Sequence, residues 1–462
     1  MSYDLIVVGS GPGGYVAAIR ASQLGMKVGV VERSELGGIC LNWGCIPTKA
    51  LLKSAQVFEY IQHAADYGVT VGNSKAEIGE MVKRSRGVAE GMSKGIQFLF
   101  KKNKIDHIEG FGKLKNGTTV EVTAADGKKT DVTAKNVILA LGARSRELPN
   151  LKQDGKKIIG YREAMVLDKQ PKKMVVVGSG AIGVEFAYFY NAIGTEVTVV
   201  EYLPSIVPVE DEEVSKQLGR SFKKSGIKIM TESSVEKVDT SGTGCKVTVK
   251  TKKGEEVLEC DIVLSAVGIQ ANVEGCGLED VGVIVDGGRV KVDEFYATNI
   301  PHVFAIGDCI AGPALAHVAS AEGIICVEKI AGKNPEPLDY GNIPGCTYCS
   351  PEVASVGYTE AKAIEAGYDI KVGKFPFSAS GKASAAGAKD GFVKLIFDAK
   401  YGELLGGHMI GANVTEMIAE IVAIRKLETT GHEIIKTVHP HPTMSEAIME
   451  AAAAAYDEVI HL

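Results

Sequence analysis

The chain has 462 residues, of which 45% are hydrophobic and 23% are charged, so its composition is that of a folded globular protein and excludes a disordered chain. Its 51 basic and 57 acidic residues give a net charge of −6, which provides no electrostatic footprint for nucleic acid or for an anionic membrane. No secretory leader and no uninterrupted apolar run of membrane-spanning length is visible, and nine cysteines are too few and odd in number for a disulfide scaffold. We therefore expect about three domains in a cytoplasmic protein, or one from the mitochondrial matrix if a transit peptide has been removed, with neither nucleic-acid nor membrane partners.

The first expected elements form one unit. An apolar strand at residues 3–8 leads into the turn formed by Gly9, Gly11 and Gly14. A helical pattern at 15–24 follows, and then a second strand at 27–31 that ends in Glu32. The order of strand, Gly-x-Gly-x-x-Gly turn, helix, strand and acidic residue is that of a dinucleotide-binding unit.

The same unit occurs a second time. A strand at 174–177 leads into a turn with the glycines Gly178, Gly180 and Gly183, and a helix at 184–192 and a strand at 196–200 precede Glu201. The first glycine and the acidic residue are 23 positions apart in both copies, and the copies lie 169 residues apart. A single glycine motif arises for packing reasons alone, but two copies in the full context predict two nucleotide sites.

Each residue type in these units has a physical role. The first glycine permits the tight turn, the second lets a pyrophosphate approach the backbone, and the third lets helix and strand pack closely. The helix N-terminus supplies amides and a positive dipole for the phosphates. Glu32 and Glu201 would accept hydrogen bonds from ribose hydroxyls. Because Glu201 would repel a 2′-phosphate and no arginine follows it directly, the second site is expected to prefer NAD over NADP.

Two cysteines follow the first unit directly. Cys40 and Cys45 lie five positions apart, about 7.5 Å along a regular helix, which is too far for a disulfide unless the helix start is distorted. Two inert thiols, half of a zinc site and a redox-active disulfide are the alternatives. No second ligand pair lies nearby, and the position beside a nucleotide site favours the redox disulfide. A helix N-terminus near Cys45, with Lys49 one turn on, would favour the thiolate of Cys45.

The rest of the chain supplies further strands and helices. Strands that end in glycine, at 137–142 and 262–268, close the two nucleotide-binding regions, and a strand at 303–306 ends in Gly-Asp. Beyond residue 340 we expect strands at 353–357 and 391–397 and helices at 415–425 and 444–459. The fold class is therefore α/β, with two Rossmann-like dinucleotide-binding domains and a C-terminal α+β domain.

Five segments carry a resemblance over the whole chain: the cysteine segment 37–49, both glycine motifs, Ala305–Asp308 and His439–Glu446. In these the chain resembles the pyridine nucleotide–disulfide oxidoreductases of class I. The resemblance implies an FAD-containing enzyme that oxidises dihydrolipoamide to lipoamide and reduces NAD+ to NADH. It also implies a homodimer with active sites shared between subunits. The implied partners are the lipoyl domain and the acyltransferase core of 2-oxo acid dehydrogenase complexes, or the lipoyl groups of the glycine cleavage system.

The resemblance also implies domains and site residues. The domains would be an FAD-binding domain in two segments, 1–143 and 271–341, an NAD-binding domain at 144–270, and a dimerisation domain at 342–462. The FAD site would comprise Gly9, Gly11, Gly14, Glu32, Gly112, Asp308 and Ala316, with Lys49 beside the flavin and paired with Glu185. The NAD site would comprise Gly178, Gly180, Gly183, Glu201, Val235 and Gly268. Cys40 and Cys45 would be the redox pair.

The implied base is His441, oriented by Glu446, and it would act on the active site of the other subunit. His439 and His317 are the alternatives, but only His441 directly precedes Pro-Thr-Met-Ser-Glu. One departure from the family pattern is Cys349, where a threonine is usual. We interpret Cys346 and Cys349 as packing thiols, and expect Cys245, Cys260, Cys276, Cys309 and Cys326 to be inert core residues. No metal site is expected.

Overall fold

The computed structural model describes residues 2–462, which form two compact units. The first unit contains the chain through Leu51, Gly79–Arg146 and Gly268–Leu338, and the second contains Leu52–Ile78, Glu147–Val267 and Asp339–Leu462. The boundaries after Arg146, Val267 and Leu338 lie near the predicted domain limits, but a division into two units does not test the predicted division into three domains. Within the described residues, no helix is long and apolar enough to cross a membrane.

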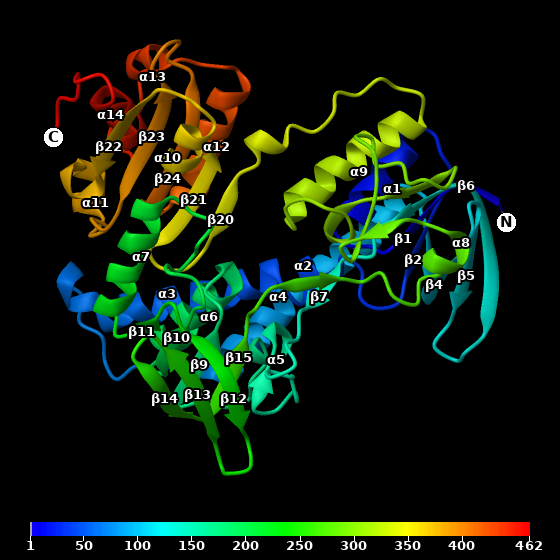
Figure 1. Ribbon diagram of the computed structural model, residues 1–462, viewed down its shortest axis with the longest axis horizontal. Helices are drawn as coiled ribbons and strands as arrows, with labels where there is room; N and C mark the ends of the chain where they lie inside the picture. Colours follow the sequence, from blue (N-terminus) through cyan, green and yellow to red (C-terminus); the bar gives the residue numbers. More distant parts are fainter. Residues whose placement is uncertain (1) are drawn as a thin grey trace. The chain divides into compact units, whose positions relative to one another are not determined.

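The first unit is built on a sheet of seven strands (Figure 1). Its strands run in the order β3-β2-β1-β6-β5-β4, and β19 pairs with β6. The parallel strands are β1 (Ser2–Val8), β2 (Val28–Glu32), β3 (Asp106–Glu109), the C-terminal half of β6 (Lys129–Leu139) and β19 (Val303–Ala305). The strands β4 (Phe111–Asn116) and β5 (Thr119–Thr123) pair antiparallel with each other, and β5 also pairs antiparallel with the N-terminal half of β6. The predicted apolar runs at 3–8 and 303–306 are therefore neighbours of β6 in one sheet.

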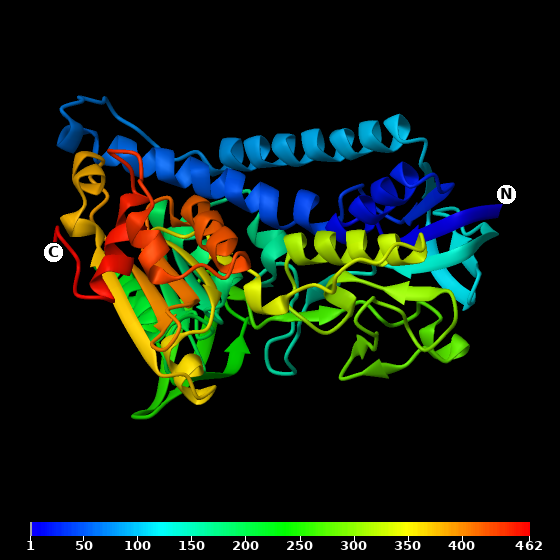
Figure 2. The same cartoon turned by 90° about the horizontal axis from the view of Figure 1, so that it is seen from above.

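Helices α1 (Pro12–Gln23) and α9 (Ala316–Ile330) pack closely within this unit, side by side in both views (Figures 1 and 2). A side chain at Gly13 would meet the carbonyl oxygen of Ala319 at 3.0 Å, and one at Gly323 would meet the carbonyl oxygen of Gly13 at 2.8 Å. Glycine at these two positions lets the backbones approach. The late segment that carries α9 is thereby fixed against the helix that follows the first glycine turn.

The second nucleotide-binding unit forms a five-stranded parallel sheet in the order β11-β10-β9-β15-β8. Its elements are β8 (Ile158–Ile159), α5 (Tyr161–Ala164), β9 (Lys173–Val177), α6 (Ala181–Ala192), β10 (Glu196–Val200), α7 (Glu212–Lys224), β11 (Lys228–Met230) and β15 (Ile262–Ser265). An antiparallel meander of β12 (Ser234–Asp239), β13 (Cys245–Thr251) and β14 (Gly254–Cys260) is inserted before β15. Both sequence repeats therefore fold as the expected βαβ units.

The C-terminal segment forms an antiparallel sheet in the order β20-β21-β24-β23-β22, against which helices α12 and α14 pack. Its elements are β20 (Gly345–Thr347), β21 (Glu352–Gly357), α10 (Glu360–Glu365), β22 (Ile370–Pro376), α11 (Gly381–Ala385), β23 (Phe392–Asp398), β24 (Leu404–Gly411), α12 (Val414–Lys426), α13 (Gly431–Lys436) and α14 (Glu446–Ala454). The α/β fold class with an α+β C-terminal part is confirmed. The helix expected at 444–459 is shorter, because α14 ends at Ala454 and Asp457 has a left-handed φ of 60°.

The remaining elements complete the chain. Helices α2 (Gly38–Asn42), α3 (Cys45–Gln62) and α4 (Ile78–Lys102) follow the first nucleotide unit, and α3 and α4 each contribute residues to both compact units. The remainder are η1 (Ala64–Tyr67), β7 (Ala143–Ser145), β16 (Ile269–Ala271), α8 (Leu278–Val281), β17 (Val285–Asp286), β18 (Arg289–Val290), η2 (Gly307–Cys309), η3 (Tyr340–Asn342) and η4 (Phe377–Ala379). Strands β7 and β16 pair antiparallel where the chain leaves and re-enters the first unit.

Candidate active site

The first glycine turn is shaped by two close backbone contacts. Gly9 has a φ of +104°, and a side chain there would meet the carbonyl oxygen of Ala140 at 2.2 Å. A side chain at Gly14 would meet the carbonyl oxygen of Gly9 at 2.0 Å. At Gly11, in contrast, no described atom lies within 4 Å of the position that a Cβ would take. The middle glycine therefore faces open space at the N-terminus of α1, where an anionic group can approach the backbone amides.

The second glycine turn has the same geometry. Gly178 has a φ of +97° and would bring a side chain to 2.4 Å from the carbonyl oxygen of Ala266. A side chain at Gly183 would lie 2.0 Å from the carbonyl oxygen of Gly178, whereas around Gly180 the described chain again leaves the Cβ position open. The two turns thus form two equivalent cradles, each at the N-terminus of a helix, and both fit a dinucleotide pyrophosphate.

A serine locks each predicted ribose-binding carboxylate. Glu32 Oε2 accepts hydrogen bonds from the Ser10 amide at 2.9 Å and the Ser10 hydroxyl at 2.8 Å. Glu201 Oε2 accepts the same two bonds from Ser179, at 2.8 and 2.6 Å. We did not predict these serines as site residues, although their place after the first glycine of both repeats was a usable signal. The anchored carboxylates are preorganised to accept hydrogen bonds from ribose, and the exposed Tyr202 and Leu203 that follow Glu201 offer no cation for a 2′-phosphate.

The other predicted FAD residues also lie in the first unit. Gly112 is on β4, where a side chain would meet Cγ1 of Val8 at 2.9 Å. Asp308 is in η2, and burial raises the pKa of its carboxyl while Arg289 lowers it. Ala316 is the first residue of α9. A further buried carboxylate, Glu322, accepts a hydrogen bond from the Gly307 amide at 2.6 Å and was not predicted.

The two cysteines lie on different helices. Cys40 is within α2, which ends at Asn42, and Cys45 is the first residue of α3, so the chain breaks its helical path at Trp43 and Gly44. The predicted distortion is therefore a complete break. Both cysteines are free thiols, and the Cys40 side chain is hydrogen-bonded to that of Cys45. This bond and burial raise the pKa of the Cys40 thiol well above its ordinary value.

The predicted Lys49, Glu185, Val235 and Gly268 are distributed over both units. Lys49 lies on the first part of α3. Glu185 is buried on α6, where its carboxylate accepts a hydrogen bond from the Tyr348 amide at 2.9 Å. Val235 is buried on β12, and Gly268 has a φ of +105° at the junction of the two units. The pairing of Lys49 with Glu185 stays a prediction.

His441 forms the predicted pair with Glu446. Its Nδ1 lies 2.8 Å from Glu446 Oε1, and Glu446 Oε2 accepts a hydrogen bond from the Thr443 amide at 2.8 Å. Burial raises the pKa of Glu446, but the bonds from Thr443 and His441 outweigh it and lower the pKa overall. The carboxylate therefore stays ionised at neutral pH and orients the ring so that Nε2 points away from it.

The neighbouring histidine has a different environment. The His439 side chain is 4% exposed, against 79% for His441. Both ring nitrogens of His439 are engaged, by the carbonyl oxygen of Thr437 at 2.9 Å and by Glu420 at 2.7 Å. His439 is thus a structural residue, and His441 is the histidine whose Nε2 is accessible to a second molecule.

Of the seven cysteines outside the Cys40–Cys45 pair, six are buried. Cys245, Cys260, Cys276, Cys309 and Cys326 are buried, and burial raises the pKa of each thiol, to about 12 for Cys260 and Cys309. Cys245 and Cys260 lie on strands and Cys326 on α9, whereas Cys276 lies in a bend and Cys309 in the short helix η2. Cys349 is also buried, and its thiol lies 3.2 Å from the carbonyl oxygen of Pro351.

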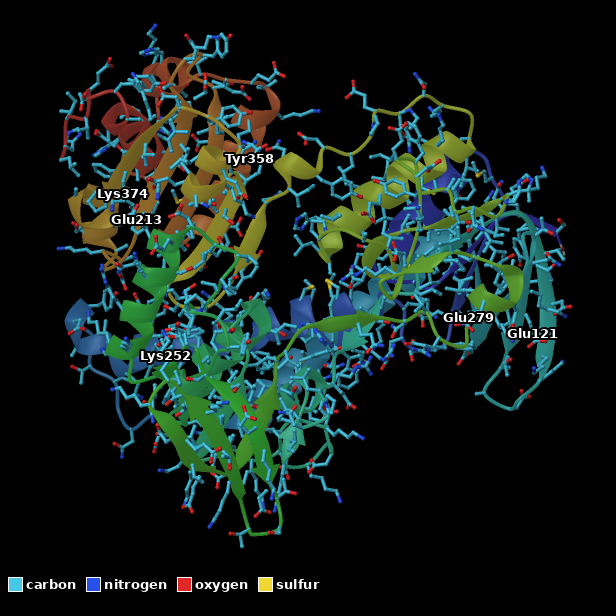
Figure 3. All side chains as sticks on the ribbon, viewed as in Figure 1. Glu121, Glu213, Lys252, Glu279, Tyr358 and Lys374 are labelled. Carbon is cyan, nitrogen blue, oxygen red and sulfur yellow. The ribbon has the colours of Figure 1, made fainter. Side chains whose placement is uncertain are left out.

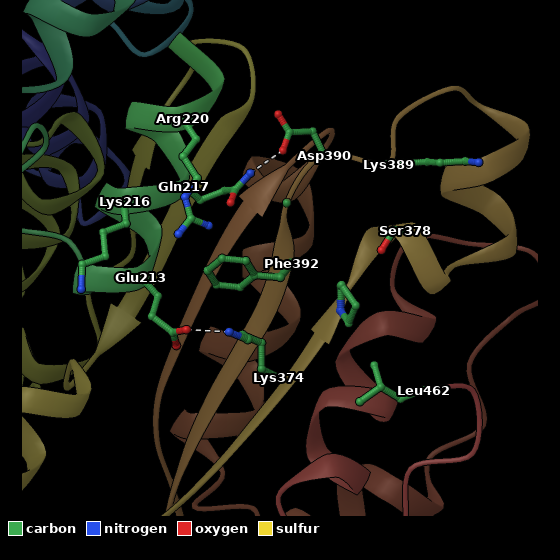
Figure 4. A pocket seen from close by; sticks show the side chains of 12 residues that line it. Glu213, Lys216, Gln217, Arg220, Lys374, Ser378, Lys389, Asp390, Phe392 and Leu462 are labelled. Carbon is green, nitrogen blue, oxygen red and sulfur yellow. Dashed lines mark hydrogen bonds and ion pairs between the residues drawn. The ribbon is translucent and has the colours of Figure 1, made fainter. Parts of the chain in front are cut away.

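A cavity of about 490 Å³ lies between α7 and the strands β22 and β23 (Figure 4). Among its charged groups, Glu213 pairs with Lys374 at 2.5 Å, and the Asp390 carboxylate accepts hydrogen bonds from Gln217 at 2.6 Å and from Ser221 at 2.7 Å. Figure 3 shows Glu213 and Lys374 side by side on the surface of the second unit. The cavity shares no residue with the predicted sites, so we do not assign the chemistry to it.

Comparison with known proteins matches residues 3–323 to the model of a family described as pyridine nucleotide-disulphide oxidoreductase, and residues 343–452 to the dimerisation domain of the same family. Curated relatives include the dihydrolipoyl dehydrogenases of Rhizobium etli (50% identical, covering 100% of this chain and 99% of the relative) and Zymomonas mobilis (49%, covering 99% of each). The mitochondrial dihydrolipoyl dehydrogenase of Pisum sativum is 43% identical, covering 99% of this chain and 92% of the relative. Among solved structures, LpdA of Mycobacterium tuberculosis superposes with a TM-score of 0.90 at 28% identity, covering 97% of this chain and 98% of LpdA.

Proposed function

Because this chain belongs to the pyridine nucleotide-disulphide oxidoreductase family, we propose that Cys40 and Cys45 are its redox-active disulfide and that His441 is its base. The enzyme oxidises dihydrolipoamide to lipoamide and reduces NAD+ to NADH. The observation that carries the residue assignment is the contact between the two thiols across the break between α2 and α3, directly after the first nucleotide-binding unit.

The two cradles support the assignment of the cofactors. The family uses FAD and NAD(H). The first turn with Glu32, Gly112, Asp308 and Ala316 would hold FAD, and the second turn with Glu201 and Val235 would hold NAD+, because each combines an open middle glycine with an anchored carboxylate. A bound FAD would supply the two-electron redox chemistry that links the dithiol to NAD+. We assign residues 1–143 and 271–341 to the FAD domain and 144–270 to the NAD domain.

The cysteines carry out the exchange with substrate. A substrate thiol loses its proton to His441 of the partner subunit, and its thiolate attacks the Cys40 sulfur, which breaks the disulfide and leaves Cys45 as a thiolate. The second substrate thiol, as its thiolate, then attacks the substrate sulfur bound to Cys40. This step forms the ring disulfide of lipoamide and releases the Cys40 thiolate, which takes up a proton. Glu446 keeps the imidazole in the tautomer with Nε2 free to accept the proton.

The chain forms a homodimer, because residues 343–452 match the dimerisation domain of the family. We propose that the two subunits share each active site and that the lipoyl groups presented by the acyltransferase core of a 2-oxo acid dehydrogenase complex, or by the glycine cleavage system, are the substrates. The curated relatives that are named dihydrolipoyl dehydrogenases support this assignment. We further propose a cytoplasmic or matrix location, where such complexes operate.

The proposal is tested with Cys40→Ser and Cys45→Ser. Each variant is expected to retain FAD, because neither cysteine belongs to the cradle at Gly11, and to lose at least about 10³-fold in dihydrolipoamide-dependent NAD+ reduction, because covalent exchange needs both sulfurs. NADPH with oxidised glutathione is the parallel assay for wild type. Normal turnover in both variants would contradict the disulfide assignment, and activity only in the second assay would contradict the nucleotide assignment based on Glu201.

A further inference from the structure

The break between α2 and α3 exposes backbone groups that need partners. The carbonyl groups in the last turn of a helix accept no hydrogen bond from that helix. Where one helix ends and another begins, these carbonyl groups therefore need hydrogen-bond donors from other parts of the chain. Here the carbonyl oxygen of Asn42, the last residue of α2, accepts a hydrogen bond from Arg86 Nη1. The same guanidinium lies over the ring of Trp43, with 4.1 Å between Cζ and the ring centroid. One side chain of α4 therefore holds two consecutive residues of the break.

The two residues that precede Arg86 contact the other side of the break. Ser85, fully buried, donates a hydrogen bond from its hydroxyl to the carbonyl oxygen of Pro47 at 2.8 Å. Arg84 donates to the carbonyl oxygen of Ala50 at 2.7 Å. Helix α4 thus contacts backbone on both sides of Cys45, all within the first unit. In Figure 2, α4 is the long light-blue helix that runs alongside α2 and the start of α3.

We propose that Arg86 is a positioning residue that fixes the separation of the Cys40 and Cys45 sulfurs by clamping the break between α2 and α3. This inference rests on the proposed function, in which these two sulfurs exchange with the substrate. Each cysteine lies on a different helix, so the effective concentration of one thiol at the other depends on how rigidly the break is held. A planar guanidinium can donate in its plane and stack with its face at once, whereas a lysine ammonium cannot do both.

The proposal is tested on the FAD-bound enzyme with dithiothreitol, a dithiol that reduces the Cys40–Cys45 bond to two thiols while it closes to its own ring disulfide. Samples are equilibrated over a series of ratios of reduced to oxidised dithiothreitol, alkylated with iodoacetamide, and the alkylation of both cysteines is counted by peptide mass spectrometry. The variants are Arg86→Gln and Arg86→Lys. The control is Lys83→Gln, which removes a cation from the exposed side of α4, where Lys83 pairs with Glu80.

Arg86→Gln is expected to need about tenfold less reduced dithiothreitol for half-reduction, the effect of losing one charge-assisted hydrogen bond that orders the pair. Arg86→Lys should shift in the same direction, since it keeps the charge but not the planar contact, and Lys83→Gln should match wild type. If Arg86→Gln does not fold, the Arg86→Lys shift decides. Variants that reach half-reduction at the same dithiothreitol ratio as wild type, or that become harder to reduce, would overturn the positioning role. A wild-type enzyme without any Cys40–Cys45 disulfide would instead overturn the proposed function itself.

Trp43 provides a second readout, because it is the single tryptophan of the chain. With excitation at a wavelength that tyrosine does not absorb, and detection at the emission of tryptophan rather than that of the flavin, the fluorescence reports on Trp43 alone. Loss of the stacked guanidinium in Arg86→Gln is expected to lower the fluorescence anisotropy of Trp43, while Lys83→Gln leaves it unchanged. An unchanged anisotropy in Arg86→Gln would mean that Arg86 does not order the break.

Discussion

At the scale of single residues, a methyl group added at Gly180 would project into space that the described chain leaves open, whereas one at Gly183 would lie 2.0 Å from the carbonyl oxygen of Gly178. The first position therefore leaves room for the proposed ligand, and the second is needed for close packing within the protein. Gly180 has a φ of −66°, which any residue can adopt, so a substitution at Gly180 introduces no backbone strain.

This difference gives a prediction for two matched substitutions. Gly180→Ala is expected to raise KM for NAD+ by about tenfold, because the methyl group occupies the approach of the pyrophosphate, with the free energy of unfolding within about 0.5 kcal/mol of wild type. Gly183→Ala is expected to destabilise the fold by about 1–3 kcal/mol through overpacking. Steady-state kinetics and thermal unfolding of both variants check this, and equal destabilisation by the two would contradict separate roles for the glycines.

Which residues could be predicted from the sequence depended on whether their partners were near in the chain. The glycines and acidic residues of both turns follow from a fixed local spacing, and their conformations agree with it. The hydrogen bonds of Ser10 and Ser179 to those acids were missed, although both serines lie within the repeated motif. The contact between Arg86 and Asn42 spans 44 positions and carries no local pattern, so only the fold brings it about.

At the scale of elements, a buried lysine joins α7 to strand β23 and helix α10. The Lys394 side chain is 1% exposed, and its ammonium lies 2.9 Å from Asp211 and from Glu213 and 2.6 Å from Glu360. Burial lowers the pKa of Lys394, but its hydrogen bonds to the three carboxylates raise it overall, so the group is charged in the folded protein. Asp211 is also the N-cap of α7, because its carboxylate accepts a hydrogen bond from the Glu213 amide.

Removal of the Lys394 ammonium is expected to destabilise the fold strongly. Lys394→Met leaves buried Asp211 without its cation, so the free energy of unfolding should fall by about 3–5 kcal/mol. The control is Lys374→Met, which removes an exposed cation from the same Glu213 and should cost less than about 1 kcal/mol. Chemical denaturation of both variants checks the prediction, and a Lys394→Met variant as stable as the control would mean that the cluster does not hold α7 in place.

The ends of elements were less predictable than their cores. The alanine-rich run that begins at Ala451 has a high helix propensity, and we expected a helix over 444–459. In the structure, the Glu450 carboxylate accepts hydrogen bonds from the Ile460 amide at 3.2 Å and from the His461 ring at 2.5 Å, so the last residues fold back on α14. Such a tertiary contact outweighs a few tenths of a kcal/mol of propensity per residue.

At the scale of the whole molecule, the dimer explains why the proposed base lies on an exposed segment. The His441 side chain is 79% exposed, and Val438, three residues earlier in the chain, is 92% exposed. An exposed apolar side chain in the same segment as an oriented histidine is typical of a surface that another subunit covers. The described residues that hold Cys40 and Cys45 belong to the first unit, and His441 belongs to the second. If the site is shared between subunits, it is complete when the two cysteines of one chain and His441 of the other chain are intact.

Subunit exchange between two inactive variants tests this sharing. Cys45→Ser keeps His441, and His441→Gln keeps both cysteines, so neither homodimer has a complete site. In a mixed dimer, the cysteines of the His441→Gln chain meet the histidine of the Cys45→Ser chain, and one of the two sites is whole. Random exchange at equal amounts makes half of the dimers mixed, so activity should recover to about a quarter of wild type.

The matched control mixes Cys45→Ser with Cys40→Ser. In those mixed dimers every site lacks one cysteine, because both cysteines of a site come from one chain, so no activity should return after the same exchange. Exchange itself is checked by mass spectrometry of the intact dimers under native conditions. If verified mixed dimers of Cys45→Ser and His441→Gln stay inactive, each chain builds its site from its own histidine, and the exposed position of His441 must then serve another purpose.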